Sequence, residues 1–134
     1  MTSQQSANQP RFHYEIAFAD QDPIESVRQE VLKGMVKLER VFNRIISCHV
    51  TLRTPHRHQV QPLHEAHIYL EIPGDDLVIN NGSSRRLSHQ DPHLAVRQAF
   101  RALHRQLRKQ VERMQERSSR PRPEPLVLEG TANL

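Results

Sequence analysis

A chain of 134 residues with one cysteine and a formal net charge of +4 has room for one compact domain, but it can form no internal disulfide and no multi-cysteine zinc framework. No apolar run is long enough to span a bilayer, and the first residues, MTSQQSANQPR, lack the charged-then-apolar layout of a secretory signal. We therefore expect a cytoplasmic protein that has no membrane partner.

The N-terminal part of the chain is a polar segment followed by a strand. Residues 1–10 contain three glutamines and no apolar periodicity, so we expect a disordered lead-in. From Phe12 to Phe18 apolar side chains occupy every second position. This spacing predicts a strand with one buried face.

A long helix is predicted next. Asp22 can act as its N-cap, and Pro23 suits the first helical position. Apolar residues then recur every three or four positions from Ile24 to Ile45, which predicts one apolar stripe along the helix. Gly34 costs this helix about 1 kcal/mol relative to alanine, and we interpret it as a point of close packing against the sheet.

Three more strands follow this helix. Alternation with a period of two returns in residues 48–52 and, after a stretch containing proline and histidine, in residues 66–72. Residues 73–76, Pro-Gly-Asp-Asp, form a tight-turn sequence, so residues 77–79 are expected to pair as the second strand of a hairpin. A polar loop is expected from 80 to 90.

The second predicted helix begins like the first. Asp91 and Pro92 repeat the Asp-Pro start, and apolar residues at helical spacing continue to Met114, which predicts a long helix ending near Ser118. Three prolines then follow within a few residues and cannot continue a helix. We therefore expect residues 118–134 to form a flexible tail.

These elements give the order β-α-β-β-β-α, which predicts an α+β fold. Each helix has an apolar stripe that must be buried, so we expect both helices to pack on one face of a four-stranded sheet. This arrangement is like that of double-stranded-RNA-binding domains. Residues 11–117 are expected to form the domain.

Positive charge is concentrated in the second helix. Residues 92–117 hold seven basic and two acidic residues, a net charge of +5, whereas the rest of the chain has a net charge of −1. On two packed helices, basic residues at helical spacing would form one continuous surface, and RNA backbone is the matching partner because neutralised phosphates release counterions. The residues of this predicted RNA-binding surface are Lys33, Lys37, Arg40, Arg44, Arg97, Arg101, Arg105 and Arg108, with Arg85 and Arg86 in the preceding loop.

A simpler interpretation is that charged residues opposite an apolar stripe form only a solvated helix face. A solubility face usually mixes lysine with glutamate, whereas the second helix has six arginines and few acids. Because arginine suits phosphate forks and base stacking, its density here favours RNA as the partner.

No enzyme activity, cofactor, metal site or small-molecule substrate is expected. His56, His58, His64 and His67 lie close in sequence, but no carboxylate at ligand spacing completes a metal-binding set. Cys48 alternates with apolar residues, so we interpret it as a core thiol rather than a nucleophile. The four glycines form no phosphate-binding loop.

Four motifs follow one another in an order that resembles a known family. Lys37-Leu38-Glu39 with Phe42 stands late in the first helix, and residues 66–72 read Ala-His-Ile-Tyr-Leu-Glu-Ile. Asp91 stands three residues before Leu94-Ala95-Val96, and residues 103–109 read Leu-His-Arg-Gln-Leu-Arg-Lys. Over residues 12–115 the chain resembles the short form of the ribosome-hibernation family, also called hibernation-promoting factor, ribosome-associated inhibitor or sigma-54 modulation protein.

The resemblance implies a function on the ribosome. Members of that family sit on the small ribosomal subunit, in the channel for messenger and transfer RNA, and inactivate ribosomes in starved or stationary cells. The small subunit and its ribosomal RNA are therefore the implied partners. Because long members carry a C-terminal dimerising domain for which this chain has no room, we expect it to bind as a monomer.

The resemblance also implies individual RNA-binding residues. Basic residues of this chain match the family pattern at Lys37, Arg105 and Lys109, with Arg28 as a fourth position. The chain departs from the pattern at His93, where an aromatic residue is usual, and at Gly34 and Ala102, where lysines are common. We expect these departures to affect the affinity for RNA more than the fold.

Two other functions fit the same residues. The chain could be a general RNA-binding or RNA-chaperone module with a similar fold, or an adaptor whose basic helix binds an acidic protein. Sedimentation of a cell extract separates these possibilities, because only a ribosome factor should co-migrate with small subunits or whole ribosomes.

Overall fold

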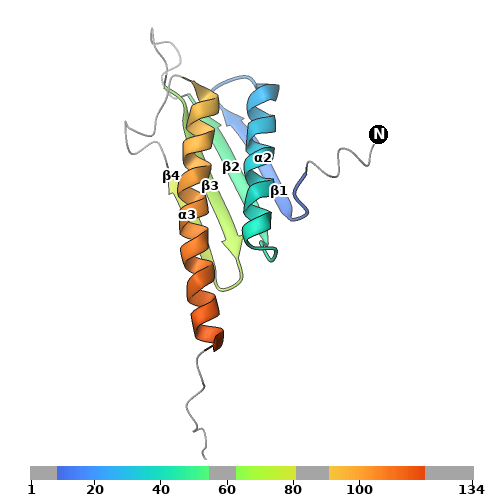
Figure 1. Cartoon of the computed structure of the whole chain (residues 1–134). Helices are drawn as coiled ribbons and strands as arrows, with labels where there is room; N and C mark the ends of the chain where they lie inside the picture. The colour runs from blue at the N-terminus through green and yellow to red at the C-terminus, as the bar shows by residue number, and fades with distance from the viewer. Residues whose placement is uncertain (1–8, 55–62, 81–90, 120–134) are drawn as a thin grey trace, which may run out of the picture.

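Two helices cover one face of a four-stranded sheet (Figure 1). The structure is a computed structural model and describes residues 9–54, 63–80 and 91–119. The elements in chain order are β1 (His13–Ala19), α2 (Glu25–Val41), β2 (Ser47–Arg53), β3 (Glu65–Ile72), β4 (Asp75–Asn80) and α3 (Pro92–Ser119). The predicted order β-α-β-β-β-α and the predicted α+β class are confirmed.

The sheet is mixed, with the strand order β1-β2-β3-β4. Strand β1 pairs with β2 in parallel, as expected for two strands joined by a crossover helix, and its register places Tyr14 beside Cys48. The β2–β3 and β3–β4 pairs are antiparallel. Alternate side chains therefore point to the helices and to the opposite, open face of the sheet.

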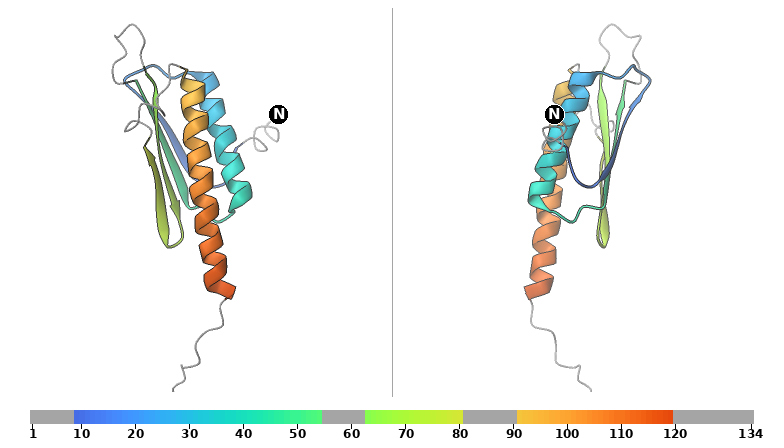
Figure 2. Two further views of the ribbon diagram at one scale, coloured as in Figure 1. Left: turned by 60° about the vertical axis from the view of Figure 1, so that its left-hand side comes forward. Right: turned by 90° about the vertical axis from the view of Figure 1, so that its right-hand side faces the viewer.

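Helices α2 and α3 lie side by side in one layer over the sheet, as the views in Figures 1 and 2 agree. Both helices run in the same direction, so their N-terminal ends are neighbours. Helix α3 is the longer of the two and continues beyond the end of α2 (Figure 1). The seam between the helices is thus a surface feature on the side away from the sheet.

The hydrophobic core lies between the helix layer and the sheet. Inward-facing residues of the strands meet the apolar stripes of both helices, which is why both helices need the sheet for stability. The largest fully buried side chains are Val27, Val31, Met35, Leu38, Val50, Ile68, Leu70, Ile72, Val96, Leu103 and Leu107.

Helix α2 begins later than its sequence predicted. Its N-cap is Ile24, which has extended backbone angles and makes no side-chain cap. The Ile24 carbonyl accepts hydrogen bonds from the amides of Val27 and Arg28 at 3.1 and 3.0 Å. The prediction that Asp22 and Pro23 start this helix was wrong, because an Asp-Pro pair suits a turn or extended backbone equally well.

Helix α2 also ends earlier than predicted. It stops at Val41, and the extended C-cap Phe42 donates its amide to the carbonyl of Leu38 at 3.0 Å. Arg44 and Ile45 therefore lie in the connection to β2 and not on the helix. Ile45 is nevertheless buried, so its apolar character continued the helical pattern beyond the true end of the helix.

Helix α3 begins as predicted, at Asp91-Pro92. The carboxylate of Asp91 accepts the backbone amide of His93 at 2.9 Å, and its carbonyl accepts the amide of Ala95 at 3.1 Å. The amide of His93, followed by its ring, lowers the pKa of Asp91 below the ordinary value. The helix includes residues 118 and 119, which the sequence assigned to the tail.

The β3–β4 hairpin has a shorter turn than predicted. Ile72 pairs with Asp75, so only Pro73 and Gly74 connect the strands, and Gly74 has a φ of +83° that favours glycine. Asp75 and Asp76, expected in the turn, belong to β4. Four predicted features lie outside the described residues: most of the N-terminal lead-in (1–8), the segment 55–62, the loop residues 81–90 and the tail from 120 to 134.

Candidate nucleic-acid interface

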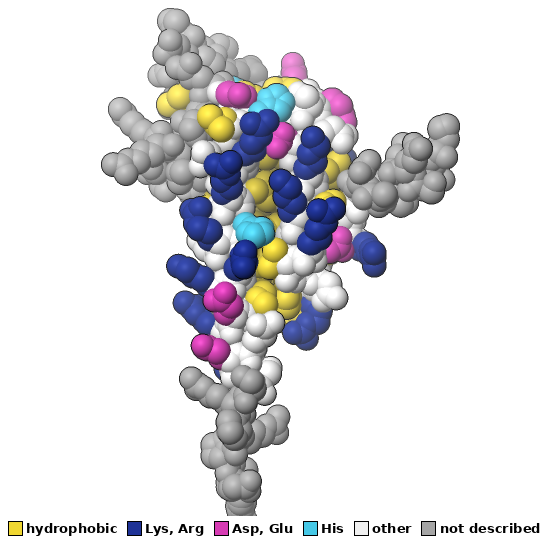
Figure 3. All heavy atoms as spheres, viewed as in Figure 1, with side chains coloured by type: hydrophobic (Ala, Val, Ile, Leu, Met, Phe, Trp, Pro, Cys, Tyr) yellow, Lys and Arg dark blue, Asp and Glu magenta, His cyan; other side chains and the backbone are white. Residues whose placement is uncertain are grey.

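Cationic side chains line both sides of the seam between α2 and α3. Figure 3 shows Lys and Arg side chains flanking a strip of hydrophobic side chains between the two helices. The N-terminal half of this seam is a groove with a volume of about 220 Å³, hereafter the interhelical groove. Its cationic and histidine lining consists of Lys33 and Lys37 from α2 and Arg97, Arg101 and His104 from α3.

The floor of the interhelical groove is apolar. It is formed by Gly34 and Leu38 of α2 and by Val96 and Phe100 of α3. A Cβ atom on Gly34 would lie 2.6–2.8 Å from three atoms of the Phe100 ring, so only glycine permits this ring to approach the α2 backbone. The prediction that Gly34 packs against the sheet was wrong, because its close neighbour is the other helix.

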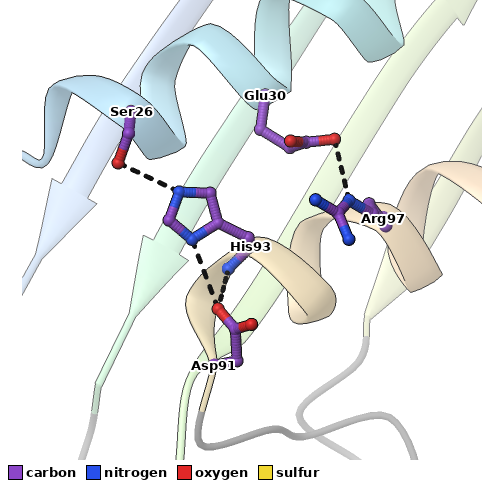
Figure 4. A network of polar contacts seen from close by, with 5 residues as sticks. All are labelled: Ser26, Glu30, Asp91, His93 and Arg97. Atoms are coloured by element: carbon purple, nitrogen blue, oxygen red, sulfur yellow. Dashed lines mark hydrogen bonds and ion pairs between the residues drawn. The ribbon is translucent and has the colours of Figure 1, made fainter.

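Polar contacts join the two helices near their N-terminal ends (Figure 4). The ring of His93 lies between Asp91 and Ser26, with Nδ1 at 3.2 Å from Asp91 Oδ1 and Nε2 at 2.9 Å from Ser26 Oγ. One turn further along, Arg97 Nε donates to Glu30 Oε2 at 3.2 Å. These contacts fix the position of α3 relative to α2 and thereby the spacing of the groove walls.

Three further predicted cations lie beyond the interhelical groove, along the rest of the seam. Arg40 and Arg44 border a second hollow that also includes Met114 of α3. The guanidinium of Arg44 lies 5.3 Å from the centroid of the Phe42 ring, a cation–π distance that holds this arginine against the protein surface. Arg108 borders a third, smaller hollow near Val41.

The remaining predicted residues line none of these three hollows. Arg105 and Lys109 are exposed on α3, and Arg28 is only partly exposed on α2. Arg85 and Arg86 lie outside the described residues. The structure therefore gathers Lys33, Lys37, Arg97 and Arg101 around one groove and distributes the others over the neighbouring helix surface, where the assignment to RNA binding stays a prediction.

Two residues of the interhelical groove were not recognised from the sequence. Glu30 is a carboxylate among cations, and His104 supplies an aromatic ring to the groove wall. Both stand beside predicted cations at helical spacing, so a helical wheel could have placed them on the same face. Nothing in the sequence, however, showed that Glu30 pairs with Arg97 across the two helices.

A nucleophilic cysteine and a metal site are two features that the sequence argued against. Cys48 is fully buried, and this burial raises the pKa of its thiol to about 12, as the core interpretation requires. Within residues 9–54, 63–80 and 91–119 no group of three metal-ligating side chains occurs. No helix in the same ranges is long and apolar enough to cross a membrane.

Comparison with protein families identifies one match. The family model described as Sigma 54 modulation protein / S30EA ribosomal protein matches residues 14–115. This range contains almost all of the sheet and both sides of the interhelical groove. A comparison with curated proteins finds no match.

Solved structures share the fold at low sequence identity. The N-terminal domain of Protein Y from Thermus thermophilus has a TM-score of 0.59 and 17% identity, covering 73% of this chain and 97% of that chain. A ribosomal subunit interface protein from Coxiella burnetii has a TM-score of 0.56 and 16% identity, covering 75% of this chain and 99% of that chain. At these identities the likeness establishes the fold alone.

Proposed function

Because the chain belongs to the Sigma 54 modulation protein / S30EA ribosomal protein family, we propose that it binds the small ribosomal subunit and inactivates ribosomes under stress or in stationary phase. The α2/α3 surface contacts ribosomal RNA in the channel for messenger and transfer RNA. The observation that carries this proposal is the concentration of cations along the seam between the two helices. The name of the Coxiella burnetii structure, a ribosomal subunit interface protein, is consistent with it.

The distribution of charge supports the helix layer as the RNA-binding face. On the open face of the sheet, the described strand residues include one arginine, Arg53, and four carboxylates, namely Glu15, Glu65, Glu71 and Asp76. These carboxylates repel phosphate, whereas the cations around the interhelical groove attract it. RNA therefore approaches the protein from the helix side.

The proposed mechanism is steric and involves no catalysis. Arginine and lysine side chains neutralise phosphates and release counterions, so the affinity falls steeply as salt is added. A domain held in this channel excludes messenger and transfer RNA by occupying their binding sites. Release of the protein from the ribosome needs no chemical step, so the inhibition is reversible. The proposed place of action is the cytoplasm, where the ribosomes are.

Co-sedimentation with purified subunits tests the proposal. The full chain should sediment with small subunits and not with large subunits at moderate salt. Replacing Arg101, Arg105 and Lys109 together by alanine should weaken this binding by at least about tenfold, since each removes a phosphate contact. All three side chains are exposed, so the melting temperature should stay unchanged.

A control at the opposite face separates a specific surface from net charge. Arg101→Ala and Arg53→Ala remove one positive charge each, but only Arg101 lines the interhelical groove. We expect a clear loss of binding for Arg101→Ala and little change for Arg53→Ala. Equal effects, or small-subunit binding that the triple substitution leaves intact, would contradict the proposed surface. Equal affinity for any structured RNA would instead indicate a general RNA-binding module.

A further inference from the structure

The interhelical groove contains a group that a pure phosphate site does not need. Glu30 lies in its lining beside the cations, with its side chain 19% exposed. Its Oε2 accepts a hydrogen bond from Arg97 Nε at 3.2 Å, and no other donor to this carboxylate is found in the part of the chain that the structure describes. A carboxylate repels phosphate but accepts N–H groups, so the inside and the rim of the groove favour different ligand groups.

The shape of the groove also differs from that of a simple charged patch. Its floor is the apolar surface of Gly34, Leu38 and Phe100, and its volume is about 220 Å³. This volume is below the roughly 300–1,000 Å³ of pockets that enclose drug-sized ligands, so the groove has room for part of a nucleotide. An apolar floor in a groove that the planar side-chain groups of Arg101 and His104 also line is suited to an aromatic ring.

We propose that the interhelical groove receives one unstacked RNA base, whose N–H edge donates to Glu30 while Lys33, Lys37 and Arg101 contact the phosphates on either side. The inference rests on the proposed function, because it requires that RNA binds this surface. It adds that the groove distinguishes unpaired from paired RNA. In a regular duplex the bases are stacked and paired, so the protein can contact phosphates and 2′-hydroxyl groups but no base can enter the groove.

The carboxylate determines which base fits best. Guanine presents two neighbouring N–H donors on its Watson–Crick edge, and a carboxylate has acceptor sites on two oxygens. Uracil presents a single ring N–H on that edge. Because Oε2 is shared with Arg97, the orientation of the carboxylate is fixed before RNA binds. We therefore assign a preference for guanine over uracil to the groove.

Binding of short RNA duplexes to the full chain tests this inference. Four two-stranded RNAs of equal length are compared by fluorescence anisotropy: one fully paired, one with a bulged guanosine, one with a bulged uridine and one with an abasic bulge. The guanosine bulge should bind about tenfold more tightly than the paired and abasic RNAs, since a good bidentate contact discriminates by about that factor. The uridine bulge should lie between them.

Glu30→Gln tests the role of the carboxylate itself. Glutamine keeps a carbonyl oxygen that can accept from Arg97, but it cannot accept two N–H groups from guanine with both of its terminal atoms. This variant should lose the preference for guanosine over uridine, measured as the ratio of the two affinities so that the removal of a negative charge that repels phosphate does not affect the comparison. Glu112→Gln, an exposed position of α3 outside the groove, makes the same change in charge and should retain the preference.

The outcomes separate this inference from the proposed function. Equal affinity for all four RNAs, with small-subunit binding intact, would overturn the base-accepting groove and leave the ribosomal function standing. Loss of the guanosine preference in both glutamine variants would likewise reject Glu30 as the recognising group. Absence of binding to every RNA and to small subunits would overturn both proposals. The comparison of the four RNAs uses the unaltered chain, so it does not depend on the folding of a variant.

Discussion

Phe100 and Leu103 are two of the core residues that hold α3 to the rest of the molecule. Leu103 is fully buried and Phe100 is 7% exposed. Alanine at either position should lower the free energy of unfolding by about 2–5 kcal/mol, because it removes buried surface and leaves a cavity. Urea unfolding measures this effect, and Val78→Ala, at an exposed residue of β4, serves as a control expected to be nearly neutral. Neutral effects at both core positions would mean that α3 is not packed as described.

Gly34 and Phe100 form a single steric unit across the seam. In an isolated helix, Gly34→Ala would stabilise the helix by about 1 kcal/mol. Here the added Cβ would meet the Phe100 ring at 2.6 Å, so we expect Gly34→Ala to destabilise the protein. In the Gly34→Ala/Phe100→Leu double variant the smaller side chain makes room, so the two changes should cost less together than the sum of the single changes. A double-mutant cycle of unfolding free energies measures this coupling, and stabilisation by Gly34→Ala alone would contradict it.

Because of Cys48, the free energy of unfolding should depend on pH in the alkaline range. Burial raises the pKa of the thiol from 9.0 to about 12. Between these values the thiol ionises in the unfolded chain but not in the folded one, so its contribution to stability is complete below pH 9 and is lost as the pH rises toward 12. The difference in unfolding free energy between the native chain and Cys48→Ala should therefore shrink across this range. A constant difference would show that the folded thiol ionises normally.

At the scale of single residues, the sequence predicted much of the cationic lining but not its geometry. Lys33, Lys37, Arg97 and Arg101 were identified because they repeat at helical spacing away from an apolar stripe. The apolar floor and the carboxylate of Glu30 depend on how two helices approach each other. That approach is set by a contact between residues far apart in the chain, for which a single sequence holds no periodic signal.

At the scale of elements, the two helix starts show when a local motif is enough to predict where a helix begins. Both carry an Asp-Pro pair, but only Asp91 caps its helix through a side-chain hydrogen bond. Asp91→Ala should therefore lower the melting temperature by a few degrees, while Asp22→Ala should leave it almost unchanged. Circular dichroism of the two variants is a matched comparison. Equal losses would imply that Asp22 also caps a helix in solution.

The sequence pattern predicted the fold because buried residues recur at every second position in strands and at every third or fourth position in helices. Alternation identified β1, β2 and β3, and the apolar stripes identified α2 and α3. The errors lie at the ends of elements, where Ile45 is buried without being helical and Asp75 is paired without being apolar. At such positions tertiary packing and strand pairing determine the conformation, and the local sequence is equally compatible with a turn or a continued helix.

For the whole molecule, the segregation of charge is the property with functional consequences. Cations surround the seam of the helix layer, and carboxylates predominate on the open face of the sheet. This asymmetry gives the protein an electrostatic orientation toward a polyanion even before contact. It explains how a chain with a net charge of only +4 can have one strongly cationic surface, as the proposed binding of RNA requires.

The most direct test of the account is the structure of this chain bound to the small ribosomal subunit by cryo-electron microscopy. The account predicts density in the channel for messenger and transfer RNA, with α2 and α3 facing ribosomal RNA, phosphates beside Lys33, Lys37 and Arg101, and the open face of the sheet turned away. The account would be contradicted by density outside this channel, or by a complex in which the carboxylate-bearing face of the sheet contacts the RNA.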